Sequence, residues 1–138
     1  DEPTPIYVHI NSYGGDTDAA LGVIDTMSSL KEHGAFIITI IEGNCSSAAT
    51  LISVAGSERR MRPNAYMRIH QFTTGIWGKK QDLDDEHKNL DKLENILLDF
   101  YRKHTNLNKT QLKKLLSREI DLTISECIEH GLVDSKQE

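Results

Sequence analysis

The sequence predicts an α/β fold with a largely parallel sheet. Two segments of strand character, residues 5–10 and 35–41, are each followed by a turn and then by a stretch of helical periodicity. Strand-turn-helix units in succession imply right-handed crossovers and parallel strands, with functional groups at the turns that follow the strands. A chain of 138 residues is long enough for one core, so a single domain over residues 1–138 is expected.

The first unit begins with residues 5–10, where β-branched and aromatic residues lead into turn formers. Asp16 can cap the helix that follows, and Gly34 can close it after His33. The apolar residues of this helix recur at helical spacing: Ala20, Val23, Ile24, Met27 and Leu30.

The second unit begins with residues 35–41, a continuous apolar run that is typical of a strand buried on both faces. Gly43 should end this strand. Either Ser46 or Ser47 should then open a helix that runs to Gly56.

Residues 57–62 are expected to form a loop, with a turn at Pro63-Asn64 leading into a further strand over residues 67–70. The pairs Arg59-Arg60 and Lys79-Lys80 are interpreted as solvated loop charges.

The second half of the sequence predicts helices. Residues 81–103 form a long amphipathic pattern whose apolar face needs a partner surface. A shorter helix should cover residues 108–117. Thr123 and Glu126 form a capping box for a last helix that ends at Gly131.

Composition excludes several classes of function. The net charge is -5 and Lys and Arg are not clustered, which argues against nucleic acid as a partner. No apolar run approaches the ~18–20 residues that would span a membrane. There is no G-x-G-x-x-G or G-x-x-x-x-G-K-[ST] motif for a nucleotide, and no zinc-ligand spacing, so neither a cofactor nor a metal is expected. With only two cysteines, a reducing compartment such as the cytosol is predicted.

Three features could carry chemistry. A serine at the first turn of a helix is well placed for acyl transfer, because free N–H groups there stabilise an oxyanion, although Ser46 and Ser47 could equally be plain N-caps. The Gly14-Gly15 pair could present N–H groups or simply make a tight turn. His70 ends a predicted strand, where a buried or edge histidine is the simpler interpretation.

A series of motifs links these features. In order and spacing, from residue 5 to residue 134, they resemble the motifs of the proteolytic subunit of the Clp protease family, ClpP. The motifs are Asn11-Ser12-Tyr13-Gly14-Gly15, Asp25-Thr26-Met27, Gly43-Asn44-Cys45-Ser46-Ser47-Ala48, Arg62-Pro63-Asn64-Ala65, Ile69-His70-Gln71 and Glu129-His130-Gly131-Leu132-Val133-Asp134.

The resemblance implies a crotonase-like, ClpP-type fold of repeated β-β-α and βαβ units. It also implies a serine endopeptidase in which Ser47 is the nucleophile and His70 is the base. The backbone N–H groups of Gly15 and Ala48 would be the oxyanion donors. In the family an earlier segment forms the axial gate and part of the unfoldase docking surface, and this sequence begins at the strand that follows it.

The resemblance leaves the acid of the triad open between two carboxylates. Counting back from residues 131–134 and the Thr123 cap places the family's aspartate on Glu119. Asp121 lies two positions later. In an extended segment both would face the same side, so either carboxylate could approach the histidine.

The resemblance further implies a homo-oligomer, two stacked seven-membered rings, with residues 81–103 as the handle helix that packs between the rings. The substrates would be peptides and unfolded proteins, an ATP-driven AAA+ unfoldase would be the partner, and the cytoplasm would be the location. No cofactor is needed for this chemistry.

The sequence departs from the family pattern at several places. Tyr13 and Phe72 stand in place of prolines, Cys45 and Ser46 stand in place of alanines, and the 57–62 loop is shorter by two residues. Two other functions fit fewer observations: a non-catalytic ring subunit, which would not explain both Ser47 and His70, and an acyl-CoA enzyme of the crotonase fold.

Overall fold

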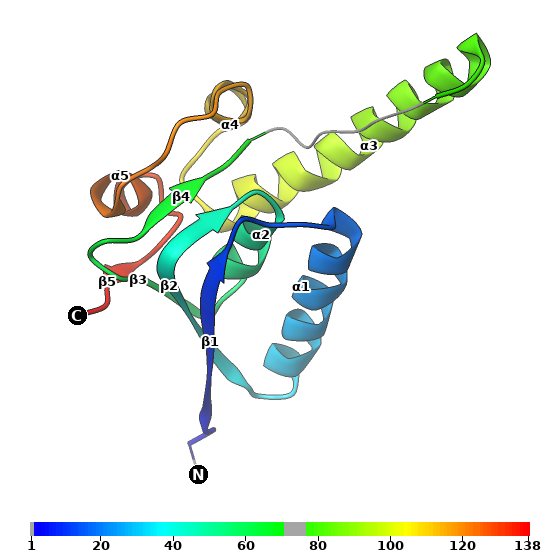
Figure 1. Ribbon diagram of the computed structural model, residues 1–138. Helices are drawn as coiled ribbons and strands as arrows, with labels where there is room; N and C mark the ends of the chain where they lie inside the picture. The colour runs from blue at the N-terminus through cyan, green and yellow to red at the C-terminus, as the bar shows by residue number, and fades with distance from the viewer. Residues whose placement is uncertain (1, 71–76) are drawn as a thin grey trace.

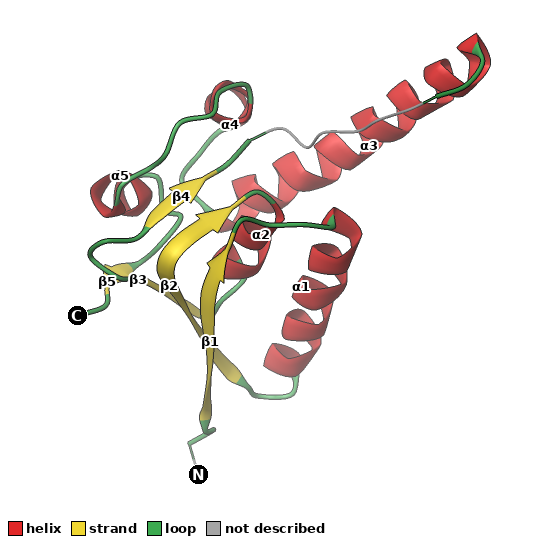
Figure 2. Ribbon diagram, in the orientation of Figure 1, coloured by secondary structure: helices red, strands yellow, loops and turns green. Residues whose placement is uncertain are grey.

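The computed structural model describes residues 2–70 and 77–138 as an α/β fold with a parallel sheet, as the sequence predicts. The strands pair in the order β1-β2-β3-β5, and β4 also pairs with β2 (Figures 1 and 2). Every one of these strand pairs is parallel. The strands are β1 (Pro5–Ser12), β2 (Phe36–Ser46), β3 (Glu58–Met61), β4 (Tyr66–Arg68) and β5 (Ser135–Lys136).

The helices connect and cover these strands. As expected for βαβ units, α1 joins β1 to β2 and α2 joins β2 to β3, and α2 packs against β2, α1 and α3. The helices are α1 (Thr17–Glu32), α2 (Ala48–Val54), α3 (Lys80–His104), α4 (Lys109–Leu116) and α5 (Ile124–Glu129).

The predicted caps of these helices are confirmed. Asp16 accepts a hydrogen bond from the Asp18 N–H group at 2.9 Å. Thr123 and Glu126 form the capping box of α5. The expected apolar face of α1 is only partly buried. Three of its residues, Ala20, Ile24 and Met27, are buried, whereas Val23 and Leu30 are exposed.

The prediction that Gly43 ends the second strand is wrong. β2 pairs with β1 in register up to Ile10 and Ile41, shifts, and pairs again at Ser12 and Cys45. Gly43 lies in this bulge with φ of 71°, a left-handed conformation that glycine adopts without strain. The strand therefore continues to Ser46, which brings its end beside β4.

The predicted loop over residues 57–62 contains strand β3, so the loop assignment is also wrong. Its sequence lacks the β-branched residues that signal strands, but β3 lies between β2 and β5 and gains its stability from pairing on both sides. Arg59 is not a solvated loop charge. Its side chain is 12% exposed and donates hydrogen bonds to both carboxylate oxygens of Asp134 and to the carbonyl of His104.

Helix α3 has two unlike ends. Near its C-terminus Leu97, Leu98 and Tyr101 are buried in the core, whereas its first turns extend away from the rest of the molecule (Figure 1). Exposed apolar side chains, Leu83 and Ile96, remain along its length. The expected apolar face of α3 therefore packs partly against the core of the same chain. In the described residues, none of the helices combines the length and apolar character needed to cross a bilayer.

Candidate active site

The serine turn, residues 46–48, joins the end of β2 to the start of α2. Ser47 has φ of 57° and ψ of -129°, and it is the one non-glycine residue with positive φ in the described parts of the chain. Such a conformation costs about 1–3 kcal/mol and persists where the surroundings impose it, often at functional sites. A strained serine between a strand and a helix presents its hydroxyl group in the manner of a nucleophile elbow.

Backbone hydrogen bonds hold the serine turn in this conformation. The Ser47 N–H group donates to the carbonyl of Arg68 in β4 at 2.9 Å. The Ser47 carbonyl accepts from the N–H group of Thr50 at 3.0 Å. The Ser47 side chain makes no capping hydrogen bond, so the alternative that this serine serves as a plain side-chain cap is wrong.

The two neighbouring nucleophile candidates are poorly placed. Ser46 is 6% exposed, and its hydroxyl group donates to Asn44 Oδ1 at 2.8 Å. Cys45 is fully buried, and burial raises the pKa of its thiol to about 12, which keeps the sulfur protonated at neutral pH. Ser47 is half-buried and is therefore the most accessible residue of the three.

The Gly14-Gly15 turn lies directly against the serine turn. A Cβ atom on Gly14 would lie 2.8 Å from the Ser46 carbonyl oxygen, 2.8 Å from Ser47 Cβ and 3.1 Å from the Ala48 nitrogen. Only glycine permits this approach, and Gly14 also has φ of 102°. The turn after β1 and the first N–H group of α2 are therefore neighbours, as a shared oxyanion site between Gly15 and Ala48 would require.

His70 follows the end of β4 by two residues. It lines a small cavity of about 20 Å³ together with Ser47 and Ala48. The other walls come from Thr17, from leucines of α2, α3 and α4, and from Tyr101. A cavity of this size has room for little more than one water molecule. Ser47 and His70 therefore line the same small cavity and lie near one another.

The acid segment, residues 117–122, runs antiparallel to β4. Met67 and Leu122 exchange two backbone hydrogen bonds of 3.0 and 2.7 Å. One position further along, Arg68 Nε donates to Asp121 Oδ1 at 2.8 Å. Both Glu119 and Asp121 are exposed, and the structure brings Asp121 to Arg68.

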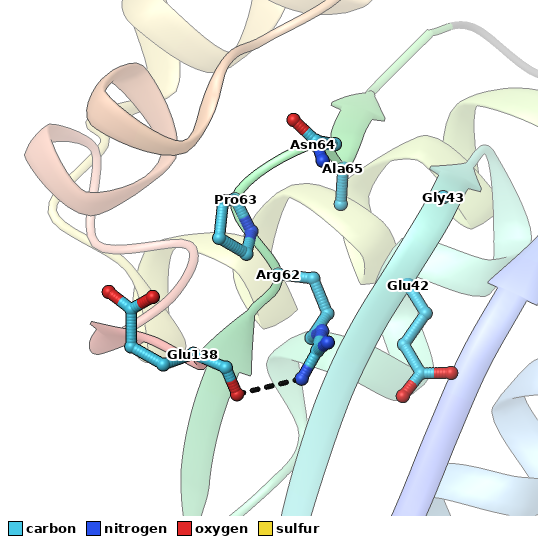
Figure 3. Close-up of a pocket in the computed structure, with 7 residues that line it drawn as sticks. All are labelled: Glu42, Gly43, Arg62, Pro63, Asn64, Ala65 and Glu138. Atoms are coloured by element: carbon cyan, nitrogen blue, oxygen red, sulfur yellow. Dashed lines mark hydrogen bonds between the residues drawn. The ribbon is translucent and has the colours of Figure 1, made fainter.

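A larger hollow lies elsewhere. It measures about 600 Å³ and lies beside the bulge of β2 and the turn before β4 (Figure 3). Arg62 crosses it to donate to the Glu138 carbonyl at 2.8 Å. None of its lining residues belongs to the serine turn, and serine, histidine and cysteine are not among them. Within residues 2–70 and 77–138, no three His, Cys, Asp or Glu side chains gather as metal ligands.

Sequence reasoning missed two residues of this region. Thr50 and Tyr101 contact the serine turn through a hydrogen-bonded pair. A threonine three positions after the serine was a visible signal, because an (i, i+3) hydroxyl group can reach back to the carbonyl. Tyr101 had no such signal, since it lies 51 positions away. Gln71 and Phe72, which entered the family resemblance, lie outside the described residues.

A parallel α/β sheet, a strained serine between strand and helix, and a histidine on the same cavity form an arrangement typical of serine hydrolases. The sequence matches the family model described as Clp protease over residues 1–136. The chain therefore belongs to the Clp protease family, and the predicted resemblance and ClpP-type fold are confirmed.

Two curated relatives agree with this placement. The chain is 34% identical to an ATP-dependent Clp protease proteolytic subunit of Deinococcus radiodurans over 131 residues, 94% of this chain and 63% of that protein. It is 32% identical to an ATP-dependent Clp protease proteolytic subunit 2 of Treponema denticola, over 94% of this chain and 64% of that protein. The chain thus spans a little under two thirds of the length of these relatives.

Proposed function

We propose that this chain is the peptidase domain of a serine endopeptidase of the Clp type, with residues 1–138 as one domain. The observation that carries the proposal is the conformation of Ser47, whose positive φ turns its hydroxyl group away from a capping role at the start of α2. Its family and its relatives, which are named as proteolytic subunits, support the same activity.

In the proposed mechanism Ser47 Oγ attacks the carbonyl carbon of the scissile peptide bond while His70 takes its proton. The backbone N–H groups of Gly15 and Ala48 bind the oxyanion that forms. His70 then gives the proton to the leaving amine, which leaves an acyl-enzyme. A water molecule, deprotonated by His70, releases the second product and restores Ser47. Neither a metal nor a cofactor takes part.

We assign the acid role to Glu119 and keep Asp121 as the alternative. Met67 pairs with Leu122 and Arg68 meets Asp121. Continued by two residues, this antiparallel register would put Glu119 opposite His70, which supports the assignment. Asp121 is already paired with Arg68. A glutamate can orient a catalytic histidine, because the requirement is a carboxylate that accepts from Nδ1–H.

Two other functions remain as rivals. A non-catalytic ring subunit would need neither the strained Ser47 nor a histidine on the same cavity. An acyl-CoA enzyme of the crotonase fold would use the paired N–H groups but leaves the serine without a role. Both explain fewer features than the peptidase does.

Assembly and partners follow from the family as part of the proposal. The projecting part of α3, with Leu83 and Leu90, is proposed as the surface that joins two stacked seven-membered rings. An AAA+ unfoldase would deliver folded substrates, and short peptides would be cut without it. Both cysteines are unpaired and buried, which suits the reducing cytoplasm.

Labelling with a fluorophosphonate tests the nucleophile. The reagent should modify Ser47, and Ser47→Ala should abolish both the label, read by intact mass, and peptide hydrolysis, by at least about 10³-fold. Ser46→Ala is the matched control and should keep most of each. A label on Ser46 or Cys45, or turnover that survives in Ser47→Ala, would overturn the assignment.

Sedimentation tests the assembly surface. Leu83→Asp combined with Leu90→Asp should dissociate the rings while the fold is kept, because neither side chain is buried in the core. Leu97 is unsuitable for this test because it is buried. A monomeric wild-type protein at high concentration would contradict the proposed rings.

A further inference from the structure

Behind the serine turn, two buried hydroxyl groups form a chain of hydrogen bonds that the proposed triad does not use. Thr50, in the first turn of α2, has no exposed surface, and Tyr101 of α3 is 4% exposed. Thr50 Oγ1 lies 2.6 Å from the Ser47 carbonyl oxygen and 2.5 Å from the Tyr101 hydroxyl oxygen. This chain connects the core end of α3 to the backbone of the candidate nucleophile.

Counting protons sets the direction of the chain. A carbonyl oxygen can only accept, so the single hydroxyl proton of Thr50 is donated to the Ser47 carbonyl. Thr50 Oγ1 must then accept from Tyr101, whose hydroxyl group is the donor. Burial raises the pKa of Tyr101, so this donor stays protonated at and well above neutral pH.

The Ser47 carbonyl is one half of a rigid unit. It shares a peptide plane with the N–H group of Ala48, and in a trans peptide the two groups point in opposite directions. Two hydrogen bonds from Thr50, one from its N–H group and one from its hydroxyl group, therefore fix the direction of the Ala48 N–H as well. That N–H group is one of the two oxyanion donors of the proposed mechanism, the other being that of Gly15.

We propose that Thr50, held by Tyr101, is a positioning residue that orients the peptide between Ser47 and Ala48 and aims its N–H group at the oxyanion. The proposal rests on the proposed peptidase function. Because the strained conformation of Ser47 offers no intrinsic preference for this orientation, the orientation must come from partners of this kind. A threonine that merely satisfies its own hydroxyl group would have no effect on the reaction.

The main test removes the hydroxyl group at nearly constant shape. Thr50→Val should lower kcat for a short peptide about tenfold to a hundredfold with KM unchanged, because the donor acts on the transition state rather than on the bound substrate. Thr50→Ser should restore most of kcat. A peptidyl boronate, which forms a tetrahedral adduct, should lose affinity for Thr50→Val by a similar factor. The pH dependence of kcat should not move, since the histidine is not affected.

A double-mutant cycle tests the role of Tyr101. Tyr101→Phe should lower kcat by about threefold to tenfold in the wild-type background and have no further effect in Thr50→Val, because both groups act through one chain of hydrogen bonds. The matched control is Ser53→Ala, which also removes a buried hydroxyl group that donates to a carbonyl three residues back, that of Thr50, and should change kcat by less than about twofold.

The outcomes separate this proposal from the proposed function. If the wild-type protein neither hydrolyses peptides nor takes the fluorophosphonate label on Ser47, the peptidase function fails and this proposal falls with it. If the wild-type protein is active and Thr50→Val keeps its kcat, or loses it only through KM, the positioning role alone is wrong. Should Thr50→Val fail to fold, Thr50→Ala replaces it, and an additive effect of Tyr101→Phe in that background would equally overturn the positioning role.

Discussion

The serine turn and the acid segment contribute to the same candidate site but are held in different ways. Ser47 is fixed through its backbone, by Arg68 on one side and Thr50 on the other. The acid segment is exposed except for Leu122, and in the described residues it is tied to β4 by one backbone bridge and the Arg68–Asp121 ion pair. The backbone of Ser47 is therefore anchored to β4 and α2, whereas the position of the acid segment depends on a short register at the surface.

Among the tests of this difference, replacing each carboxylate in turn should have the largest effect on the rate of acylation. Glu119→Gln should lower the rate of acylation by about 10²–10⁴-fold, the scale for a histidine that loses its orienting partner, whereas Asp121→Asn should cost less than about tenfold. Pre-steady-state kinetics with a peptide ester would measure both. The opposite ranking would assign the role to Asp121. Two nearly normal enzymes would mean that neither carboxylate orients His70.

A substitution at Gly14 should disrupt the serine turn. Gly14→Ala places a Cβ atom 2.8 Å from the backbone of the serine turn at φ of 102°, and should destabilise the protein by about 2–4 kcal/mol. Gly22→Ala is the control, because nothing lies within 4 Å of its Cβ position in α1, and it should stabilise by about 0.5–1 kcal/mol. Urea unfolding measures both. An equal response would show that the close contact is tolerated.

Alkaline unfolding probes the buried side of the serine turn. The pKa of the Cys45 thiol is raised to about 12 in the fold, against about 8.5 in the unfolded chain. Below about pH 8.5 the thiol is protonated in both states, and its full contribution to the free energy of unfolding is present. As the pH rises toward 12 the thiol ionises only in the unfolded chain, so this contribution is lost at about 1.4 kcal/mol per pH unit. The pKa of the Cys127 thiol is also raised to about 12, so Cys127 adds the same dependence on pH. Cys45→Ala should roughly halve the pH slope of the unfolding free energy between pH 9 and 10, below the range in which Tyr101, whose pKa burial also raises, adds its own dependence. An unchanged slope would exclude Cys45 as its source.

The smallest effect is expected at the residue that links both regions. Arg68 accepts the Ser47 N–H through its carbonyl and binds Asp121 through its side chain. Arg68→Met keeps the first contact and removes the second, so peptide hydrolysis should fall by less than about tenfold, with labelling of Ser47 at its normal site. High salt weakens surface ion pairs, so it should also lower the activity of the wild-type protein. A loss as large as that of Glu119→Gln would show that the ion pair sets the register.

How far the sequence predicted this structure depended on the range of the signals. The caps at Asp16 and Thr123 are local, and both were found. Strand β3 was missed because its stability comes from β2 and β5, which the sequence of residues 58–61 does not reveal. Gly43 was misjudged because a glycine can end a strand or form a bulge inside it, and the partner strand decides.

The candidate site shows the same limit. Periodicity left Ser46 and Ser47 equivalent as helix openers, and the family motif favoured Ser47; the backbone angles and the Ser46–Asn44 hydrogen bond distinguish them physically. The link between Thr50 and Tyr101 joins α2 to α3, and no local pattern could predict it. The sequence left Glu119 and Asp121 as alternatives, because the carboxylate that meets His70 depends on how residues 117–122 pair with β4, a contact between distant segments.

The strained angle at Ser47 also bears on how selection would act on this chain. A residue at φ of 57° burdens stability unless its side chain is useful, and glycine would occupy the position without that penalty. A gene copy released from catalysis would therefore gain stability by drifting to glycine at this position. Retention of serine there is what an active lineage would show, so the sequence at this one position can help to separate cutting subunits from subunits that only complete a ring.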